Sequence, residues 1–176
     1  MSPGGSPPLA AVLTGAVGEL ITTSGLSGAV IGVGVDAVDL DRFRRVLDRR
    51  VHLADRLFTA GERAYAAAAS DPVPRLSTRF AAKEATMKAL GVGLGAFAFA
   101  EVEVVRSGLG APWLVLHGSA LERAGAAGVW RWHLSLTHTD RVAMALVVAE
   151  GRLAGGAPDP EPVAPARRST GPVPKP

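Results

Sequence analysis

Apolar and polar residues alternate along several stretches of the chain, a pattern that predicts β-strands with one buried face. The stretches with this alternation are residues 29–35, 98–105, 112–118, 131–138 and 141–150. The last two are separated only by a few residues around His138 to Asp140, which predicts a hairpin. Helical periodicity is expected over residues 40–50, 59–69 and 79–91. A strand followed by helices and then by several strands favours an α+β fold with an antiparallel sheet packed against helices.

The first strand has two unequal faces. Its odd-numbered positions from 31 to 35 are apolar, whereas Gly32, Gly34 and Asp36 share the opposite face. A strand face of two glycines that ends in an aspartate leaves room for another group to approach closely. Asp39 is expected to cap the helix that follows. The buried stripe of that helix consists of Leu40, Phe43, Val46 and Leu47.

The two later helices have recognisable beginnings. Thr59 and Glu62 have the spacing of a capping box, in which each side chain accepts a bond from the other residue's backbone amide. Pro72 and Pro74 are expected to lie in a loop that precedes the third helix, residues 79–91.

The third helix, RFAAKEATMKALG, combines a face of small residues with an arc of charge. At 3.6 residues per turn the small residues fall together and form a flat face suited to close packing: Ala81, Ala82, Ala85, Thr86 and Ala89. The remaining arc carries the charged residues Arg79, Lys83, Glu84 and Lys88.

Two interpretations of this charged arc remain open. Glu84 and Lys88 could form an ordinary i,i+4 ion pair on a solvated face, contributing about 0.2–0.5 kcal/mol. Glu84, however, lies between Phe80 and Met87, so its carboxylate is expected to need a defined partner. A carboxylate among cations suits a polyphosphate, because the carboxylate binds Mg²⁺, the metal binds phosphate oxygens and the cations bind the rest. Asp36 is the candidate for a second carboxylate ligand.

Composition and charge narrow the class of protein. The chain has 176 residues, 48% of them hydrophobic, which suits one globular domain. It has no cysteine, which excludes disulfides and thiolate chemistry and is compatible with the cytoplasmic location that we expect. A formal charge of +3 is a mild bias toward anionic partners. No Lys/Arg block is interleaved with aromatic residues, so nucleic acid is not an expected partner.

Three segments are predicted along the chain. Residues 1–29 are apolar but interrupted by Glu19, serines and glycines, so we expect a weakly ordered extension with a short helix near 8–20 and no membrane span. Residues 30–150 form the folded domain. Residues 151–176 contain seven of the thirteen prolines and are expected to form a disordered tail.

Three motifs follow one another in a distinctive order. They are IGVGVDAVDLDRF (31–43), RFAAKEATMKALGVG (79–93) and HLSLTHTDRVAMALVV (133–148), with a G-x-P at Gly110 and Pro112. This ordered set resembles the holo-acyl-carrier-protein synthase family of 4′-phosphopantetheinyl transferases over residues 30–150. The resemblance implies that family's fold and its reaction. The family transfers phosphopantetheine from coenzyme A to a serine of an acyl carrier protein and releases adenosine 3′,5′-bisphosphate.

The resemblance also implies roles for the central residues. Asp36 and Glu84 match the family's two carboxylates that bind Mg²⁺, which bridges the pyrophosphate of coenzyme A. Lys88 matches the motif lysine and is expected to stabilise the phosphoryl oxygens in the transition state. Glu84, directly or through a metal-bound water, is the expected base for the serine hydroxyl, and both routes stay open.

A second group of residues matches the family's site for the 3′-phosphate of coenzyme A. The group consists of Arg79, His138 and Thr139, whose guanidinium, imidazole and hydroxyl are suitable donors. Taken alone, His138 could equally be a structural histidine in a hairpin. Lys83 could equally be a charge on the helix surface or a residue that contacts the ligand.

The resemblance extends to the partners. The first helix presents Arg42, Arg45 and Arg49, which we interpret as a docking surface for an acidic carrier protein, although a solvated face neutralised by nearby aspartates is the simpler alternative. One copy of the motif set implies, in this family, a homotrimer. In such a trimer His138 and Thr139 would serve Glu84 of the adjacent subunit.

Two functions of other classes are also compatible with the sequence. One is a non-catalytic scaffold that binds anions or nucleotides, and the other is a metal-dependent nucleotide pyrophosphatase. The scaffold has no use for Asp36 opposite Glu84, because carboxylates repel phosphate unless a metal intervenes. Nothing in the sequence separates a carrier of fatty-acid synthesis from one of polyketide synthesis.

Overall fold

The computed structural model describes residues 28–50, 52–106 and 110–152. The helix expected near residues 8–20, and nearly all of the two terminal segments, lie outside these ranges. None of the described helices is long and apolar enough to cross a membrane.

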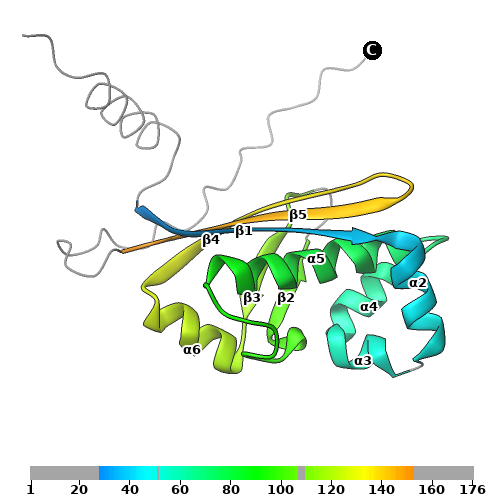
Figure 1. The fold of residues 1–176 in the computed structure, drawn as a ribbon, viewed down its shortest axis with the longest axis horizontal. Helices are drawn as coiled ribbons and strands as arrows, with labels where there is room; N and C mark the ends of the chain where they lie inside the picture. The colour runs from blue at the N-terminus through cyan, green and yellow to red at the C-terminus, as the bar shows by residue number, and fades with distance from the viewer. Residues whose placement is uncertain (1–27, 51, 107–109, 153–176) are drawn as a thin grey trace, which may run out of the picture.

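The described chain forms two antiparallel sheets and five α-helices, which confirms the α+β class (Figure 1). The strands are β1 (Ala29–Asp39), β2 (Val102–Val105), β3 (Trp113–Leu116), β4 (Val129–His138) and β5 (Val142–Gly151). The helices are α2 (Leu40–Arg49), α3 (Leu53–Leu57), α4 (Ala60–Ala67), α5 (Val73–Ala89) and α6 (Gly118–Ala126), with a 3₁₀ turn η1 (Phe99–Glu101). One sheet has the strand order β1-β5-β4, and β2 pairs with β3 in a separate hairpin, so the single sheet expected from the strand pattern is two sheets.

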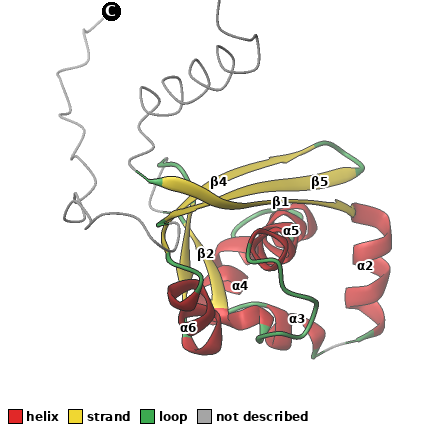
Figure 2. Cartoon of the chain, turned by 60° about the vertical axis from the view of Figure 1, so that its left-hand side comes forward, coloured by secondary structure: helices red, strands yellow, loops and turns green. Residues whose placement is uncertain are grey.

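Helix α5 lies across one face of the three-stranded sheet (Figures 1 and 2). Its alanine face is fully buried, as expected from the periodicity, with Ala81, Ala82 and Ala85 all at 0% exposure. Helix α5 is the group that approaches the glycine face of β1. A Cβ built on Gly34 would lie 1.8 Å from the carbonyl oxygen of Ala85, and one on Gly32 would lie 1.9 Å from that of Ala89. The two small-residue faces therefore allow helix and sheet to pack backbone against backbone.

We expect Gly34→Ala to destabilise the protein by about 3 kcal/mol or more, because the added methyl group meets a helix carbonyl that has no freedom to move aside. Gly93→Ala is the matched control: no atom lies within 4 Å of a Cβ at Gly93 and its φ is not positive, so we expect a change below about 0.5 kcal/mol. Urea unfolding of both variants measures the difference. Equal midpoints would contradict the close packing of α5 on β1.

Several element boundaries differ from those expected. Helix α5 begins at Val73 rather than near residue 79, because Pro74 lies in the first turn, where the missing N–H leaves no bond unmade. Residues 99–101 form η1 instead of the start of a strand. Helices α3 and α6 were not expected; α3 has only five residues, too few to give a clear period. The caps at Asp39 and at Thr59 with Glu62 are confirmed.

The other face of the three-stranded sheet is apolar and exposed. Val33 is 57% exposed and Val35 52%, and on β5 Met144 and Leu146 are exposed beside them. No described helix covers this face in either view (Figures 1 and 2). An apolar surface of this kind on the described residues indicates an interaction site.

Candidate active site

The structure brings Asp36, Glu84 and Lys88 together where β1 passes over α5. The Nζ of Lys88 donates to Asp36 Oδ1 at 2.8 Å and to the carbonyl oxygen of Val35 at 2.9 Å. Asp36 is the strand residue that follows the glycine face, and Glu84 and Lys88 are one helical turn apart on α5. Of the two interpretations left open for this arc, the i,i+4 ion pair of Glu84 with Lys88 is not formed among the described residues; Lys88 forms an ion pair with Asp36 across the strand–helix junction.

The environment of Glu84 disfavours its ionised form. Burial raises the pKa of the Glu84 carboxyl, and the negative charge of Asp36 raises it further, while Lys88 opposes both effects. A partly buried carboxyl whose pKa is raised by a neighbouring carboxylate marks a place that is favourable for a cation. The half-buried position of Glu84 beside Phe80 agrees with the expectation that its carboxylate needs a defined partner.

A cavity of about 640 Å³ adjoins the two carboxylates. It is lined by Asp36, Asp39, Arg42 and Glu84 at polar positions and by aromatic and aliphatic side chains from α2, α3, α5 and η1 elsewhere. Phe43, Phe80 and Phe99 form a row of rings within it, with centroids 5.2 and 5.3 Å apart between successive rings. A mostly apolar hollow with a few polar groups at one side is the usual form of a site for a small organic ligand.

The carboxylates fit a magnesium ion. Mg²⁺ prefers oxygen ligands, and in sites that handle phosphates it commonly takes one or two carboxylates, with water and substrate oxygens completing the shell. Asp36 and Glu84 supply two such oxygens beside an open cavity, and the described residues provide no cluster of three metal-ligating side chains. Water and substrate oxygens would complete the shell of an ion held by these two carboxylates.

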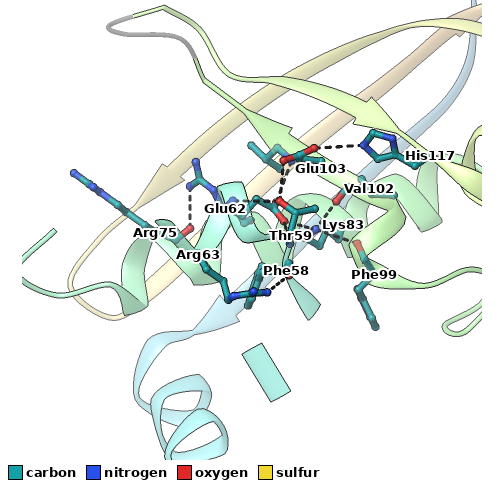
Figure 3. Close-up of polar contacts among 12 residues, drawn as sticks. Phe58, Thr59, Glu62, Arg63, Arg75, Lys83, Phe99, Val102, Glu103 and His117 are labelled. Atoms are coloured by element: carbon teal, nitrogen blue, oxygen red, sulfur yellow. Dashed lines mark hydrogen bonds and ion pairs between the residues drawn. The ribbon is translucent and has the colours of Figure 1, made fainter. Parts of the chain in front are cut away.

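Lys83, in contrast, lies in the interior, where its side chain meets Glu62 and the backbone of Phe99 and Val102 (Figure 3). Its side chain is 0% exposed and its Nζ donates to Glu62 Oε2 at 2.8 Å, to the carbonyl oxygen of Phe99 at 3.0 Å and to that of Val102. Glu62 also accepts from the backbone amides of Thr59 and Val104. Two interpretations of Lys83 were left open, a surface charge and a ligand contact. Neither is correct, because all three N–H donors of its ammonium group are used inside the fold.

Arg79 is also separated from the carboxylates. It is only 4% exposed, and its guanidinium carbon lies 4.1 Å from the centre of the Tyr65 ring. Burial lowers the pKa of Arg79, and the charge of Glu62 partly opposes the effect. One Nη donates to the carbonyl oxygen of Arg75 at 3.1 Å, while the buried Nε has no partner among the described residues.

His138 and Thr139 lie at the β4–β5 turn and are exposed, which agrees with the expected hairpin. The Thr139 hydroxyl accepts bonds from the amides of Arg141 and Val142 and so shapes the turn. Within the described residues, no hydrogen bond or ion pair joins this turn to Arg79 or to Asp36. One chain therefore does not assemble the whole set of residues that the motifs select.

The predicted docking arginines are on the solvent side of α2. Arg42, Arg45 and Arg49 are all exposed, and Arg42 also lines the cavity next to Asp36. The neighbouring Arg44 differs, since it forms a bidentate pair with Asp71 at 2.6 and 3.2 Å. The helix therefore presents one of these cations, Arg42, at the cavity that the two carboxylates also line.

Comparison with known proteins identifies the family. The family model of the 4′-phosphopantetheinyl transferase superfamily matches residues 32–147. A holo-[acyl-carrier-protein] synthase of Frankia casuarinae is 48% identical over 122 residues, which cover 69% of this chain and 98% of the relative. The chain therefore belongs to the holo-[acyl-carrier-protein] synthase family of phosphopantetheinyl transferases, a family of enzymes.

Solved structures agree with this assignment. The crystal structure of the holo-[acyl-carrier-protein] synthase from Neisseria meningitidis superposes with a TM-score of 0.64 at 33% identity, covering 69% of this chain and 99% of that one. The Bacillus anthracis synthase, solved in complex with CoA (3′,5′-ADP), superposes with a TM-score of 0.58 at 31% identity, covering 69% and 97%. The fold expected from the motif set is confirmed by these likenesses.

Proposed function

We propose that this protein transfers the 4′-phosphopantetheine group of coenzyme A to a serine of an apo-acyl carrier protein, with Mg²⁺, and releases adenosine 3′,5′-bisphosphate. The observation that carries the proposal is the pair Asp36 and Glu84 beside Lys88, at the edge of a cavity large enough for part of coenzyme A. Family membership supports it, and relatives have been crystallised with coenzyme A.

The residues of this chain have distinct tasks in the proposed reaction. Asp36 and Glu84 would hold Mg²⁺, which supplies charge neutralisation for the pyrophosphate when it is bound. Glu84 accepts the proton of the serine hydroxyl as the serine oxygen bonds to the phosphorus that carries pantetheine. The bond from that phosphorus to the adenosine bisphosphate oxygen breaks. Lys88, already directed at Asp36, donates to the phosphoryl oxygens as their charge increases.

The proposal includes a homotrimer with sites between neighbouring chains. Two observations support an assembly: the exposed apolar face around Val33 and Leu146, and the lack, among the described residues, of a hydrogen bond or ion pair from the β4–β5 turn to Arg79 or Asp36. In the assembly His138 and Thr139 of one chain would join Arg79 of its neighbour at the 3′-phosphate of coenzyme A. Light scattering should give three times the chain mass of 18.1 kDa, and a monomer at assay concentration would overturn the proposal.

The reaction is tested by the intact mass of an acidic apo-carrier protein after incubation with this protein, coenzyme A and Mg²⁺. A gain of one phosphopantetheine, lost when the metal is chelated, is the expected result. Binding of coenzyme A that is strongly salt-dependent but indifferent to Mg²⁺, with no mass gain on several carriers, would favour an anion-binding scaffold. Cleavage of coenzyme A without transfer would favour a pyrophosphatase.

Charge reversal at the docking surface should weaken carrier recognition. We expect Arg45→Glu, at a docking arginine that does not line the cavity, to raise the KM for the carrier protein about tenfold or more, with the KM for coenzyme A changed less than threefold, because rim charges act mainly on association. Arg123→Glu, an exposed arginine on α6, is the matched control and should leave both constants unchanged. The two constants are measured from initial rates at varied carrier and varied coenzyme A. An equal rise in both variants would indicate a general effect of net charge.

A further inference from the structure

Three guanidinium groups gather around the single tyrosine of the chain. The guanidinium carbons of Arg75 and Arg79 lie 4.7 and 4.1 Å from the centre of the Tyr65 ring. Arg106, from the end of β2, directs an Nη at the Tyr65 hydroxyl at 3.4 Å. These residues come from α4, from α5 and from the position that follows β2, so the cluster exists only in the folded chain.

The cluster is held in place by backbone contacts. Arg75 donates to the carbonyl oxygen of Tyr65 at 2.8 Å, and Arg79 donates to that of Arg75 at 3.1 Å. Arg106 Nε donates to the carbonyl oxygen of Gly110 at 3.0 Å. Each arginine is thus anchored through part of its guanidinium.

The positive charge of the cluster is not neutralised by an ion pair. Among the described residues, no carboxylate lies within ion-pair distance of Arg75, Arg79 or Arg106, although Glu62 acts on Arg79 at longer range. Arg79 is 4% exposed and its Nε lacks a partner. A buried, unpartnered donor beside two further cations costs free energy that an anion would recover.

The positive charges of the three arginines also act on the pKa of the Tyr65 hydroxyl. Burial raises the pKa of Tyr65, but the hydrogen bond from Arg106 and the charges of the three arginines outweigh it and lower the pKa overall. The cluster thus stabilises negative charge placed among its donors.

We propose that Tyr65 is a positioning residue that holds Arg75, Arg79 and Arg106 as one site for a phosphate monoester, the 3′-phosphate of coenzyme A. The inference rests on the proposed function, which assigns only Arg79 to this phosphate; the role of Tyr65 and the recruitment of Arg75 and Arg106 are additional. The ring provides a stacking surface for two guanidinium planes and its hydroxyl orients the third. The site therefore selects coenzyme A over its 3′-dephospho form.

The test compares coenzyme A with 3′-dephospho-coenzyme A as donors for Tyr65→Leu, Tyr65→Phe and Arg75→Gln. We expect Tyr65→Leu to raise the KM for coenzyme A about tenfold, with kcat changed less than threefold and the constants for the 3′-dephospho form changed less than twofold. Tyr65→Phe retains the stacking surface and should restore most of the affinity, losing only the contact with Arg106. Arg75→Gln should resemble Tyr65→Leu, whereas Arg123→Gln on α6 removes one charge elsewhere and serves as the control.

The outcomes separate this inference from the proposed function. If the wild-type protein transfers nothing from either donor, the proposed function fails. If it transfers from coenzyme A but Tyr65→Leu lowers kcat/KM equally for both donors, or Tyr65→Phe is no better than Tyr65→Leu, then Tyr65 has only a structural role and the inference is overturned. Isothermal titration with adenosine 3′,5′-bisphosphate gives a second readout, in which the Tyr65→Leu affinity should fall about tenfold.

Discussion

Glu84→Gln is expected to lower kcat for phosphopantetheine transfer by about 10²- to 10⁴-fold, the range typical for loss of a general base. Glutamine neither accepts the serine proton nor provides the anionic oxygen that, with Asp36, favours a divalent cation. The rate is measured by intact mass of the carrier at saturating coenzyme A and Mg²⁺. Transfer that survives in this variant would keep the reaction but remove Glu84 from its mechanism.

The same substitution should not harm the fold. Because the pKa of the Glu84 carboxyl is raised above 4.5, by burial first and by Asp36 second, the folded state holds that proton more tightly than the unfolded state. Ionised Glu84 therefore costs stability, and the cost appears as pH rises above 4.5 and is complete above the folded pKa. Thermal unfolding without metal at pH 8 should show Glu84→Gln at least as stable as the wild type, and added Mg²⁺ should stabilise only the wild type. A lower Tm for the variant at pH 8 would make Glu84 a structural carboxylate.

Lys83→Met is expected to destabilise the protein by about 3–5 kcal/mol, the largest effect on folding that we expect from a single charge removal. The substitution preserves most of the side-chain volume but leaves the Glu62 carboxylate buried at 0% exposure without its cation. It also leaves the carbonyl oxygens of Phe99 and Val102 without this donor. Guanidinium chloride unfolding, monitored by circular dichroism, gives the change in the free energy of unfolding.

A double variant distinguishes the ion pair from general packing damage. Glu62→Gln combined with Lys83→Met removes both charges and keeps one acceptor oxygen, which can serve either the amide of Thr59 or that of Val104 but not both. It should therefore recover part of the loss, since most of the cost of breaking a buried pair is the uncompensated charge that remains. If Lys83→Met left the stability unchanged but reduced the activity, Lys83 would act at the ligand site and not in the stability of the fold.

Much of the local structure could be predicted from residue pattern alone. The cap at Asp39 and the capping box of Thr59 with Glu62 are confirmed, because a cap depends on residues within one turn of one another. The alternating faces of β1 are confirmed for the same reason. Glu62 also shows the limit of such reasoning: its bonds to Lys83 and Val104 span 21 and 42 residues, and no spacing rule relates positions so far apart.

Likewise, only some residues of the candidate site could be predicted from the sequence. Sequence reasoning selected Asp36, Glu84 and Lys88, and the fold places them together. It overlooked Tyr65 and Arg106, which lie 41 residues apart and meet only because β2 packs beside α4. No short-range signal indicated that pairing.

The sequence by itself determined the fit between helix and sheet: alanines at one helical period and glycines at one strand period are local patterns, and each makes a flat face wherever its element forms. It also placed Arg79, Lys83, Glu84 and Lys88 on one polar arc of α5. Only the tertiary structure decided that this arc is not one site. The packing of α4 and β2 encloses Arg79 and Lys83, while β1 and α2 leave Glu84 at an open cavity and Lys88 remains exposed beside Asp36. Helical periodicity fixes the direction of a side chain, but whether water, a counter-charge or a ligand meets it depends on residues from distant parts of the chain.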